Sequence, residues 1–125
     1  MDPRKLHGMI VLAGFLPMYV AGGFGVEFPM IGFEHLDTTY ENTGFVRVAL
    51  HMTAALMLGS ALSEINLEMS MKTFAQYHWL LSAVIVLWQV GDTATPLGKA
   101  MFALPHLFTV WSTFLYLGGD SKKSD

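Results

Sequence analysis

The chain has 125 residues, of which 53% are hydrophobic and only 14% are charged, whereas about a quarter of the residues in a soluble domain are charged. This length allows one domain, and the composition argues against a soluble protein. The net charge is −3 and the sequence has no basic patch, so nothing supports nucleic-acid binding. The chain contains no cysteine, which excludes disulfides and cysteine-based metal sites.

Apolar residues gather in four stretches, at about 6–26, 44–63, 73–90 and 96–117. A helix needs roughly 20 apolar residues to cross a bilayer core about 30 Å thick, and these stretches approach or reach that length. The third stretch has no polar face, which a helix of a soluble bundle would need. The sequence therefore predicts an all-α integral membrane protein. Its single domain over 1–125 is an antiparallel bundle of four transmembrane helices, followed by a polar tail over 118–125.

The first stretch follows Arg4 and Lys5, an arrangement that also begins a signal peptide. Its apolar run is long for a signal peptide, and three further stretches remain in either case, so a transmembrane helix is the better interpretation. Pro17 near the middle predicts a kink in this helix. The loop 27–43 that follows contains four acidic residues and no Lys or Arg, as a translocated segment does.

The second stretch carries small residues at every fourth position, namely Ala55, Gly59 and Ser63. This spacing lets another helix approach closely, so we expect the small-residue seam to pack against a neighbour. Two carboxylates follow, Glu64 and Glu68. We expect both to be solvated, because they lie at a water-exposed helix end.

Local signals mark the ends of the third and fourth stretches. Trp79 and Trp88 lie toward opposite ends of the third, which fits anchoring at the two membrane interfaces. Thr95 and Pro96 predict an N-cap followed by proline at the first position of the fourth helix. Pro105 inside that helix predicts a bend.

Basic residues predict the orientation of the bundle. With four crossings, both termini and the loop 64–72 share one side of the membrane. That side carries five Lys or Arg residues against two on the other. Because basic residues are retained in the cytoplasm, both termini are predicted to be cytoplasmic. The five are Arg4, Lys5, Lys72, Lys122 and Lys123, and the two are Arg47 and Lys99.

Each apolar stretch contains one histidine, and ionisable side chains inside a membrane usually face protein or water. His7 and His78 lie at the cytoplasmic ends of their helices, near the surface. His51 and His106 lie deeper in the opposite half, where antiparallel connectivity places them in one layer.

Arg47 lies four residues before His51 and projects from the same helical face, and Asp92 ends the neighbouring helix on that side. The candidate catalytic cluster is therefore Arg47, His51, Asp92 and His106. A histidine there can act as acid or base, with Asp92 orienting it and Arg47 stabilising negative charge on a lipophilic substrate. The plainer alternatives are an Arg47 that snorkels to the interface, an Asp92 that only ends a turn, and histidines that only pack.

His51 and His106 also form the pair that bis-histidine haem ligation would need, and one histidine would hold a pigment such as chlorophyll. No cytochrome motif surrounds them. The nine methionines are dispersed through apolar runs, as packing residues are, and do not form a copper site. We therefore expect no metal site and, in the preferred interpretation, no cofactor.

Arg47 in the second stretch, Val90-Gly91-Asp92 closing the third and His106 in the fourth resemble the polar pattern of small four-helix DoxX-like membrane proteins. The resemblance extends over most of the chain only as hydropathy and order of spans. It implies the fold more than the function, since many members of that group have no assigned activity. The long acidic first loop departs from a compact version of this pattern.

Together these features predict a small polytopic membrane protein whose polar intramembrane pocket binds, and in one version converts, a lipophilic small molecule. The alternative is an accessory subunit of a larger membrane complex that holds haem or another pigment through histidine. Expected partners are membrane lipids, the lipophilic molecule, and other membrane subunits or further copies of the chain.

Overall fold

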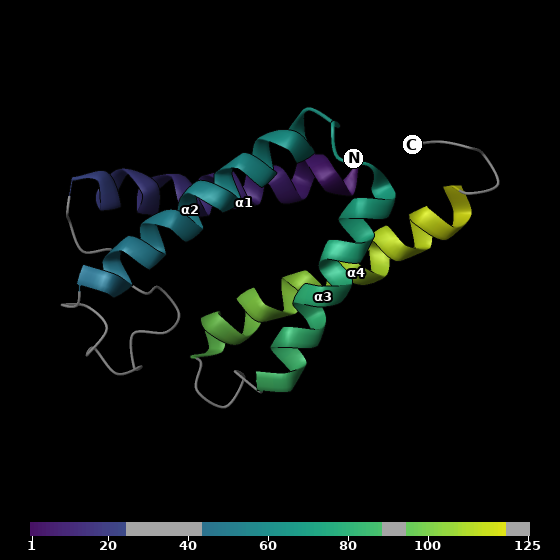
Figure 1. The fold of residues 1–125 in the computed structure, drawn as a ribbon. Coiled ribbons are helices and arrows are strands. Elements are labelled where there is room, and N and C mark those ends of the chain that lie inside the picture. Colours follow the sequence, from purple (N-terminus) through teal and green to yellow (C-terminus); the bar gives the residue numbers. More distant parts are fainter. Residues whose placement is uncertain (25–43, 89–94, 120–125) are drawn as a thin grey trace. The chain divides into compact units, whose positions relative to one another are not determined.

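The computed structural model describes residues 1–24, 44–88 and 95–119, and all regular structure in this part of the chain is helical (Figure 1). The described elements are α1 (Pro3–Gly23), α2 (Gly44–Ile65), α3 (Met71–Trp88) and α4 (Pro96–Gly119). Their bounds lie within three residues of the predicted ones, which confirms the all-α prediction. The chain forms two compact units, a hairpin of α1 with α2 and a hairpin of α3 with α4, each described below by itself.

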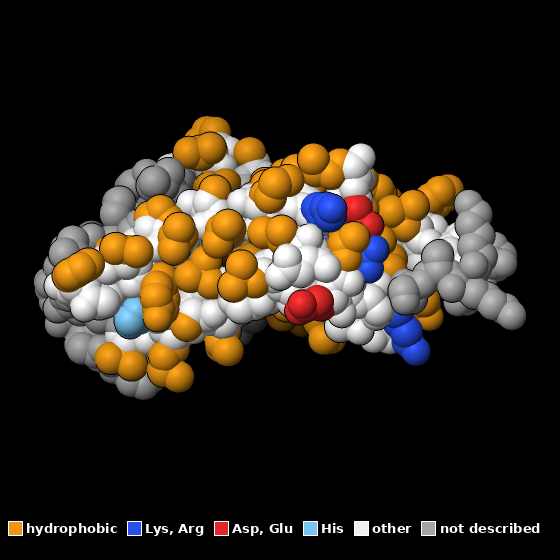
Figure 2. All heavy atoms as spheres, turned by 90° about the horizontal axis from the view of Figure 1, so that it is seen from above, with side chains coloured by type: hydrophobic (Ala, Val, Ile, Leu, Met, Phe, Trp, Pro, Cys, Tyr) orange, Lys and Arg blue, Asp and Glu red, His pale blue; other side chains and the backbone are white. Residues whose placement is uncertain are grey.

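Three of these helices are long and apolar enough to cross a membrane: Pro3–Gly23, Val48–Ile65 within α2, and Pro96–Gly119. α3 is not among them, because its first two turns carry Lys72, Thr73 and Gln76. Large hydrophobic side chains cover much of the surface seen in Figure 2, and charged side chains are few on that face. Such a surface suits contact with lipid rather than with water.

Gly8 brings α1 and α2 close together in an antiparallel hairpin. A Cβ at Gly8 would lie 2.7 Å from both the Ala61 carbonyl oxygen and Ile65 Cγ1, so only glycine fits this contact. Ala54 and Ala61 are fully buried on the facing side of α2. Small residues therefore do mediate this helix contact, as in membrane proteins generally.

The predicted small-residue seam is not the surface that packs against α1. Ala55 and Gly59 are exposed, and a Cβ at Gly59 would meet nothing within 4 Å. The face turned toward α1 instead carries Ala54 and Ala61, one position earlier and two positions later along the helix. One position corresponds to about 100° of rotation about a helix axis, so the face of α2 that meets α1 differs from the face of the predicted seam.

Aromatic rings and hydroxyl groups join α3 to α4. The Phe74 and Phe108 rings are both buried and meet edge to face, with centroids 6.4 Å apart. Trp79 Nε1 donates a hydrogen bond to Thr113 Oγ1 at 2.6 Å. Hydrogen bonds of this kind between helices replace the water that an apolar environment does not supply.

Side-chain caps explain where three helices begin. Thr95 Oγ1 accepts from the Gly98 N–H at 3.3 Å, which confirms the predicted N-cap of α4. Ser70 Oγ accepts from the Thr73 N–H at 3.1 Å, so α3 begins at Met71 rather than at the predicted Thr73. Asp2 caps α1. The pKa of the Asp2 carboxyl is held below its usual value, mainly by hydrogen bonds from the Arg4 side chain.

Leu67 ends α2 in a left-handed conformation, with φ of 58°. The Glu68 N–H bonds the Ser63 carbonyl at 2.9 Å, and the Leu67 N–H bonds the Glu64 carbonyl at 3.1 Å. This is the Schellman pattern, in which glycine normally occupies the left-handed position. A leucine there carries a steric cost of roughly 1–2 kcal/mol.

Leu67→Gly is expected to raise the free energy of unfolding by up to about 1 kcal/mol, because glycine adopts the left-handed conformation without the steric cost of a Cβ. Reversible unfolding in mixed micelles, followed by circular dichroism, measures the change. Asn66→Gly is the matched control: Asn66 is not among the non-glycine residues with positive φ, so this variant should be less stable than the wild type. A Leu67→Gly variant as destabilised as Asn66→Gly would contradict the assignment.

Candidate functional site

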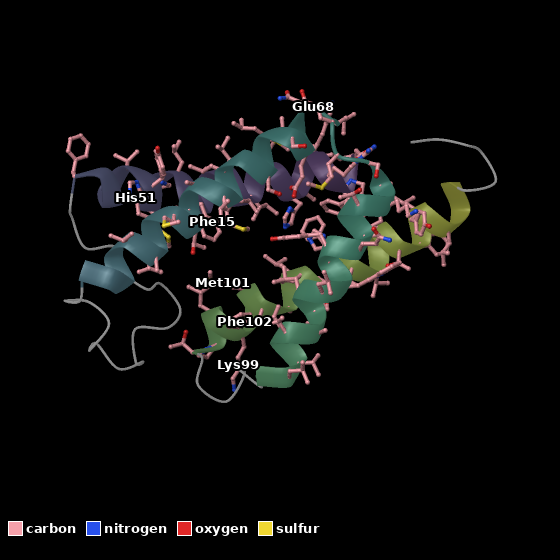
Figure 3. The ribbon with its side chains drawn as sticks, viewed as in Figure 1. Phe15, His51, Glu68, Lys99, Met101 and Phe102 are labelled. Carbon is pink, nitrogen blue, oxygen red and sulfur yellow. The ribbon has the colours of Figure 1, made fainter. Side chains whose placement is uncertain are left out.

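The described histidines divide between the two hairpins, with His7 and His51 on the first and His78 and His106 on the second. Figure 3 shows His51 on the part of α2 that lies away from Glu68. Asp92 and the side chain of Arg47 lie outside the described residues. The cluster of Arg47, His51, Asp92 and His106 therefore stays a prediction, and each histidine is described within its own hairpin.

His7 and Glu64 form a buried pair between α1 and α2. The His7 Nδ1 and Glu64 Oε2 atoms are 2.5 Å apart, and the two residues are 7% and 0% exposed. The Ser60 hydroxyl donates to the other carboxyl oxygen of Glu64 at 3.2 Å. Two lone pairs would repel at such a separation, so a proton must lie between the nitrogen and the oxygen.

This pair corrects one prediction. Glu64 is fully buried, so the expectation that it is solvated is wrong, while Glu68 is exposed as expected. His7 lies near the end of α1, as expected, and is buried against α2. The cause is the close approach at Gly8, next to His7, where a Cβ would lie 3.2 Å from Glu64 Cβ. A sequence signal existed: both residues fall at the same end of two helices predicted to be antiparallel.

His51 lies at the other end of this hairpin, against the last turn of α1. A Cβ at Gly22 would lie only 2.7 Å from His51 Cδ2, and the Tyr19 and His51 rings are 4.7 Å apart with a tilt of 41°. His51 Nε2 is buried, and no described residue forms a hydrogen bond with it. A buried imidazole nitrogen in this condition can accept a partner that the described residues do not supply.

In the second hairpin, a chain of hydroxyl groups fixes the orientation of His106. His106 Nδ1 lies 3.0 Å from Ser82 Oγ, which lies 2.7 Å from Thr109 Oγ1. The Thr109 hydroxyl donates to the carbonyl oxygens of Pro105, at 2.7 Å, and of His78, at 2.9 Å. These bonds link α3 to α4.

The direction of these bonds sets the tautomer of His106. Carbonyl oxygens only accept, so the Thr109 hydrogen is directed at them and Ser82 must donate to Thr109. Ser82 can then only accept from His106, whose Nδ1 must carry a hydrogen. A neutral His106 therefore has an unprotonated Nε2 with a lone pair.

His78 fits the plainer structural interpretation. Its Nδ1–H donates to the Phe74 carbonyl oxygen at 2.9 Å, and its ring packs 4.2 Å from the Phe74 ring and 6.0 Å from the Phe108 ring. The residue is fully buried within the protein. Aromatic packing and the Nδ1 hydrogen bond hold the ring between α3 and α4, while its Nε2 is buried in the same way as that of His51.

Among the described residues, no group of three or more His, Cys, Asp or Glu side chains lies close enough to hold a metal ion. Comparison with protein-family models, with curated proteins and with solved structures finds no match for this chain. The resemblance to DoxX-like proteins therefore stays a prediction.

A double-mutant cycle tests the pairing of His7 with Glu64. His7→Ala and Glu64→Ala should each destabilise the protein, and the double variant should lose less than the sum, with a coupling of about 1–3 kcal/mol. Unfolding in mixed micelles measures all four proteins. Glu68→Ala is the matched control, since this carboxylate is exposed and should couple to His7 by less than about 0.5 kcal/mol. Additive effects of His7→Ala and Glu64→Ala would show that the two side chains do not interact.

Proposed function

We propose that the chain is a small multi-pass membrane protein that binds a lipophilic small molecule through intramembrane histidines, and that His106 exchanges a proton with this ligand. The observation that carries the proposal is the hydrogen-bond chain from Thr109 through Ser82, which requires a hydrogen on His106 Nδ1 and so leaves a lone pair on Nε2 of the neutral imidazole. α4 is one of the helices apolar enough to span a membrane, and ionisable residues in such helices mark functional sites by default.

The tautomer limits the chemistry of the ligand. An unprotonated Nε2 accepts a hydrogen bond, so the ligand group beside it presents an O–H or N–H hydrogen. A lipophilic molecule with one hydroxyl group meets both this requirement and the apolar character of the helices. His106 then takes up the proton of that group as a general base.

The other predicted residues keep roles in the proposal. In the second hairpin, Ser82 holds His106 Nδ1, which is the orienting role expected of Asp92. In the first hairpin, His51 offers an imidazole nitrogen of its own, since its Nε2 is buried and no described residue bonds it. The roles of Arg47 and Asp92 stay those expected from the sequence.

The second candidate is an accessory membrane subunit that holds haem or another pigment through His106 or His51. The same lone pair on His106 Nε2 is what an axial ligand uses, and a hydrogen bond from the other ring nitrogen is the usual support of a metal-bound histidine. This candidate differs from the first in a measurable way, because such a group absorbs visible light.

We also propose that all four helices cross the membrane and that both termini are cytoplasmic. The support is the distribution of basic residues, five against two, together with three helices of sufficient length and hydropathy.

His106→Gln should reduce the amount of lipophilic molecule that co-purifies with the protein at least tenfold, because glutamine places no basic nitrogen at the same point. Mass spectrometry of extracts from protein in native-lipid discs measures this amount, and an absorption spectrum of the same sample reports haem or pigment. Thr113→Val is the control, since Thr113 bonds Trp79 in the same hairpin and should leave the amount unchanged. A wild-type protein that carries only bulk lipid, or a His106→Gln variant with full occupancy, would contradict the proposal.

Because the chain contains no cysteine, single substitutions can report its topology. In oriented membranes, Lys5→Cys and Lys72→Cys should react with an impermeant thiol reagent only from the cytoplasmic side, and Lys99→Cys only from the other. All three positions are exposed in the structure, so an absent reaction reflects the membrane. Lys72→Cys and Lys99→Cys reacting from the same side would show that α3 does not cross.

A further inference from the structure

We propose that the His7–Glu64 pair is a proton-binding site and that the proton it holds controls the packing of α1 against α2. The pair is buried, joins two helices apolar enough to span a membrane, and is not used in the proposed role of His106. The inference rests on the α1–α2 hairpin alone. The outcome of its test therefore does not depend on whether His106 binds a ligand.

The number of protons on the pair determines its charge. With one proton between Nδ1 and Oε2 and another on Nε2, the pair has no net charge, whether it is written as imidazole with carboxylic acid or as imidazolium with carboxylate. Loss of a proton leaves a net negative charge between the helices, and gain of one leaves a net positive charge. An unbalanced charge is costly in an apolar interface, so the packed hairpin favours the neutral pair.

The positions of the two residues favour the form with carboxylic acid and neutral imidazole. His7 is the fifth residue of α1, near the positive end of that helix dipole, and Glu64 lies in the last turn of α2, at the negative end. An imidazolium at His7 would lie near the positive end of α1, and a carboxylate at Glu64 would lie near the negative end of α2. Both charges would therefore be destabilised.

Among the described residues, the other charged groups near this end of the α1–α2 hairpin are Asp2, Arg4, Lys5 and Glu68. On the α1 side, Arg4 is bound to Asp2 through contacts of 2.8 and 3.0 Å, and Lys5 is exposed. On the α2 side, Ser60 donates to Glu64 without carrying charge, and Glu68 is exposed. Exposed charges are screened by water and act weakly on a buried pair.

The close packing beside the pair turns a change of charge into a change of structure. A Cβ at Gly8 would already overlap the Ala61 carbonyl oxygen, and Ala61 is fully buried. Water cannot enter such an interface to solvate a charge unless the helices separate. A protein that has lost or gained a proton at the pair therefore relieves the charge by opening this end of the hairpin.

The pH dependence of unfolding in mixed micelles tests the inference. For the wild type, the unfolding equilibrium constant should pass through a minimum and rise at least tenfold on both the acid and the alkaline side. Glu64→Gln preserves shape and hydrogen bonding but cannot lose a proton, so the rise on the alkaline side should disappear. Glu68→Gln removes an exposed carboxylate one turn away and should keep the wild-type profile. A Glu64→Gln profile equal to that of the wild type, or an equal change in Glu68→Gln, would overturn the inference.

A second measurement decides the question if Glu64→Gln does not fold. In ¹⁵N-histidine-labelled wild-type protein, the shared proton should give a strongly downfield proton resonance with a through-space dipolar contact to His7 Nδ1. The resonance should persist in Glu68→Gln and disappear at alkaline pH together with loss of α1–α2 contacts. Its absence at every pH, or its disappearance with those contacts unchanged, would overturn the inference.

Discussion

A polar side chain between two apolar helices needs a hydrogen-bond partner, and this requirement determines how the helices of both hairpins pack. An unbonded polar group costs several kcal/mol in an apolar medium, roughly as much as the whole stability of some small domains. In the first hairpin, His7, Glu64 and Ser60 satisfy one another across α1 and α2. In the second, hydroxyl groups satisfy His106 and the Trp79 indole across α3 and α4. These bonds select the helix faces that meet.

The two hairpins meet the requirement with different chemistry, and different properties follow. A histidine paired with a carboxyl group shares a proton that either partner can hold, so the charge of this pair responds to proton exchange. A histidine bound to serine, as His106 is to Ser82, has a partner that does not ionise in the physiological range. Its tautomer is fixed and its second nitrogen is committed to accepting. The first arrangement suits a change of packing, and the second suits ligand binding.

His51 differs from both, because its Nε2 is buried and no described residue bonds it. The ring is nevertheless held firmly, between Tyr19 and the glycine surface at Gly22. A positioned imidazole with an uncommitted nitrogen is what a binding site needs before its ligand arrives. His51 and His106 were selected from depth along the helices, and each has a nitrogen suited to the proposed role.

The sequence by itself determined the elements, because hydropathy, caps and prolines act within a few residues of the chain. The Thr95 cap, the apolar lengths and the all-α class all follow from such local properties. Only the tertiary structure decided which faces meet. Glu64 was expected in water and is buried against His7, and the contact with α1 uses Ala54 and Ala61 rather than the predicted seam. Interactions within a helix do not change when the helix rotates about its axis. The rotation is therefore determined by residues far along the chain, as Glu64 is paired with His7, 57 positions away.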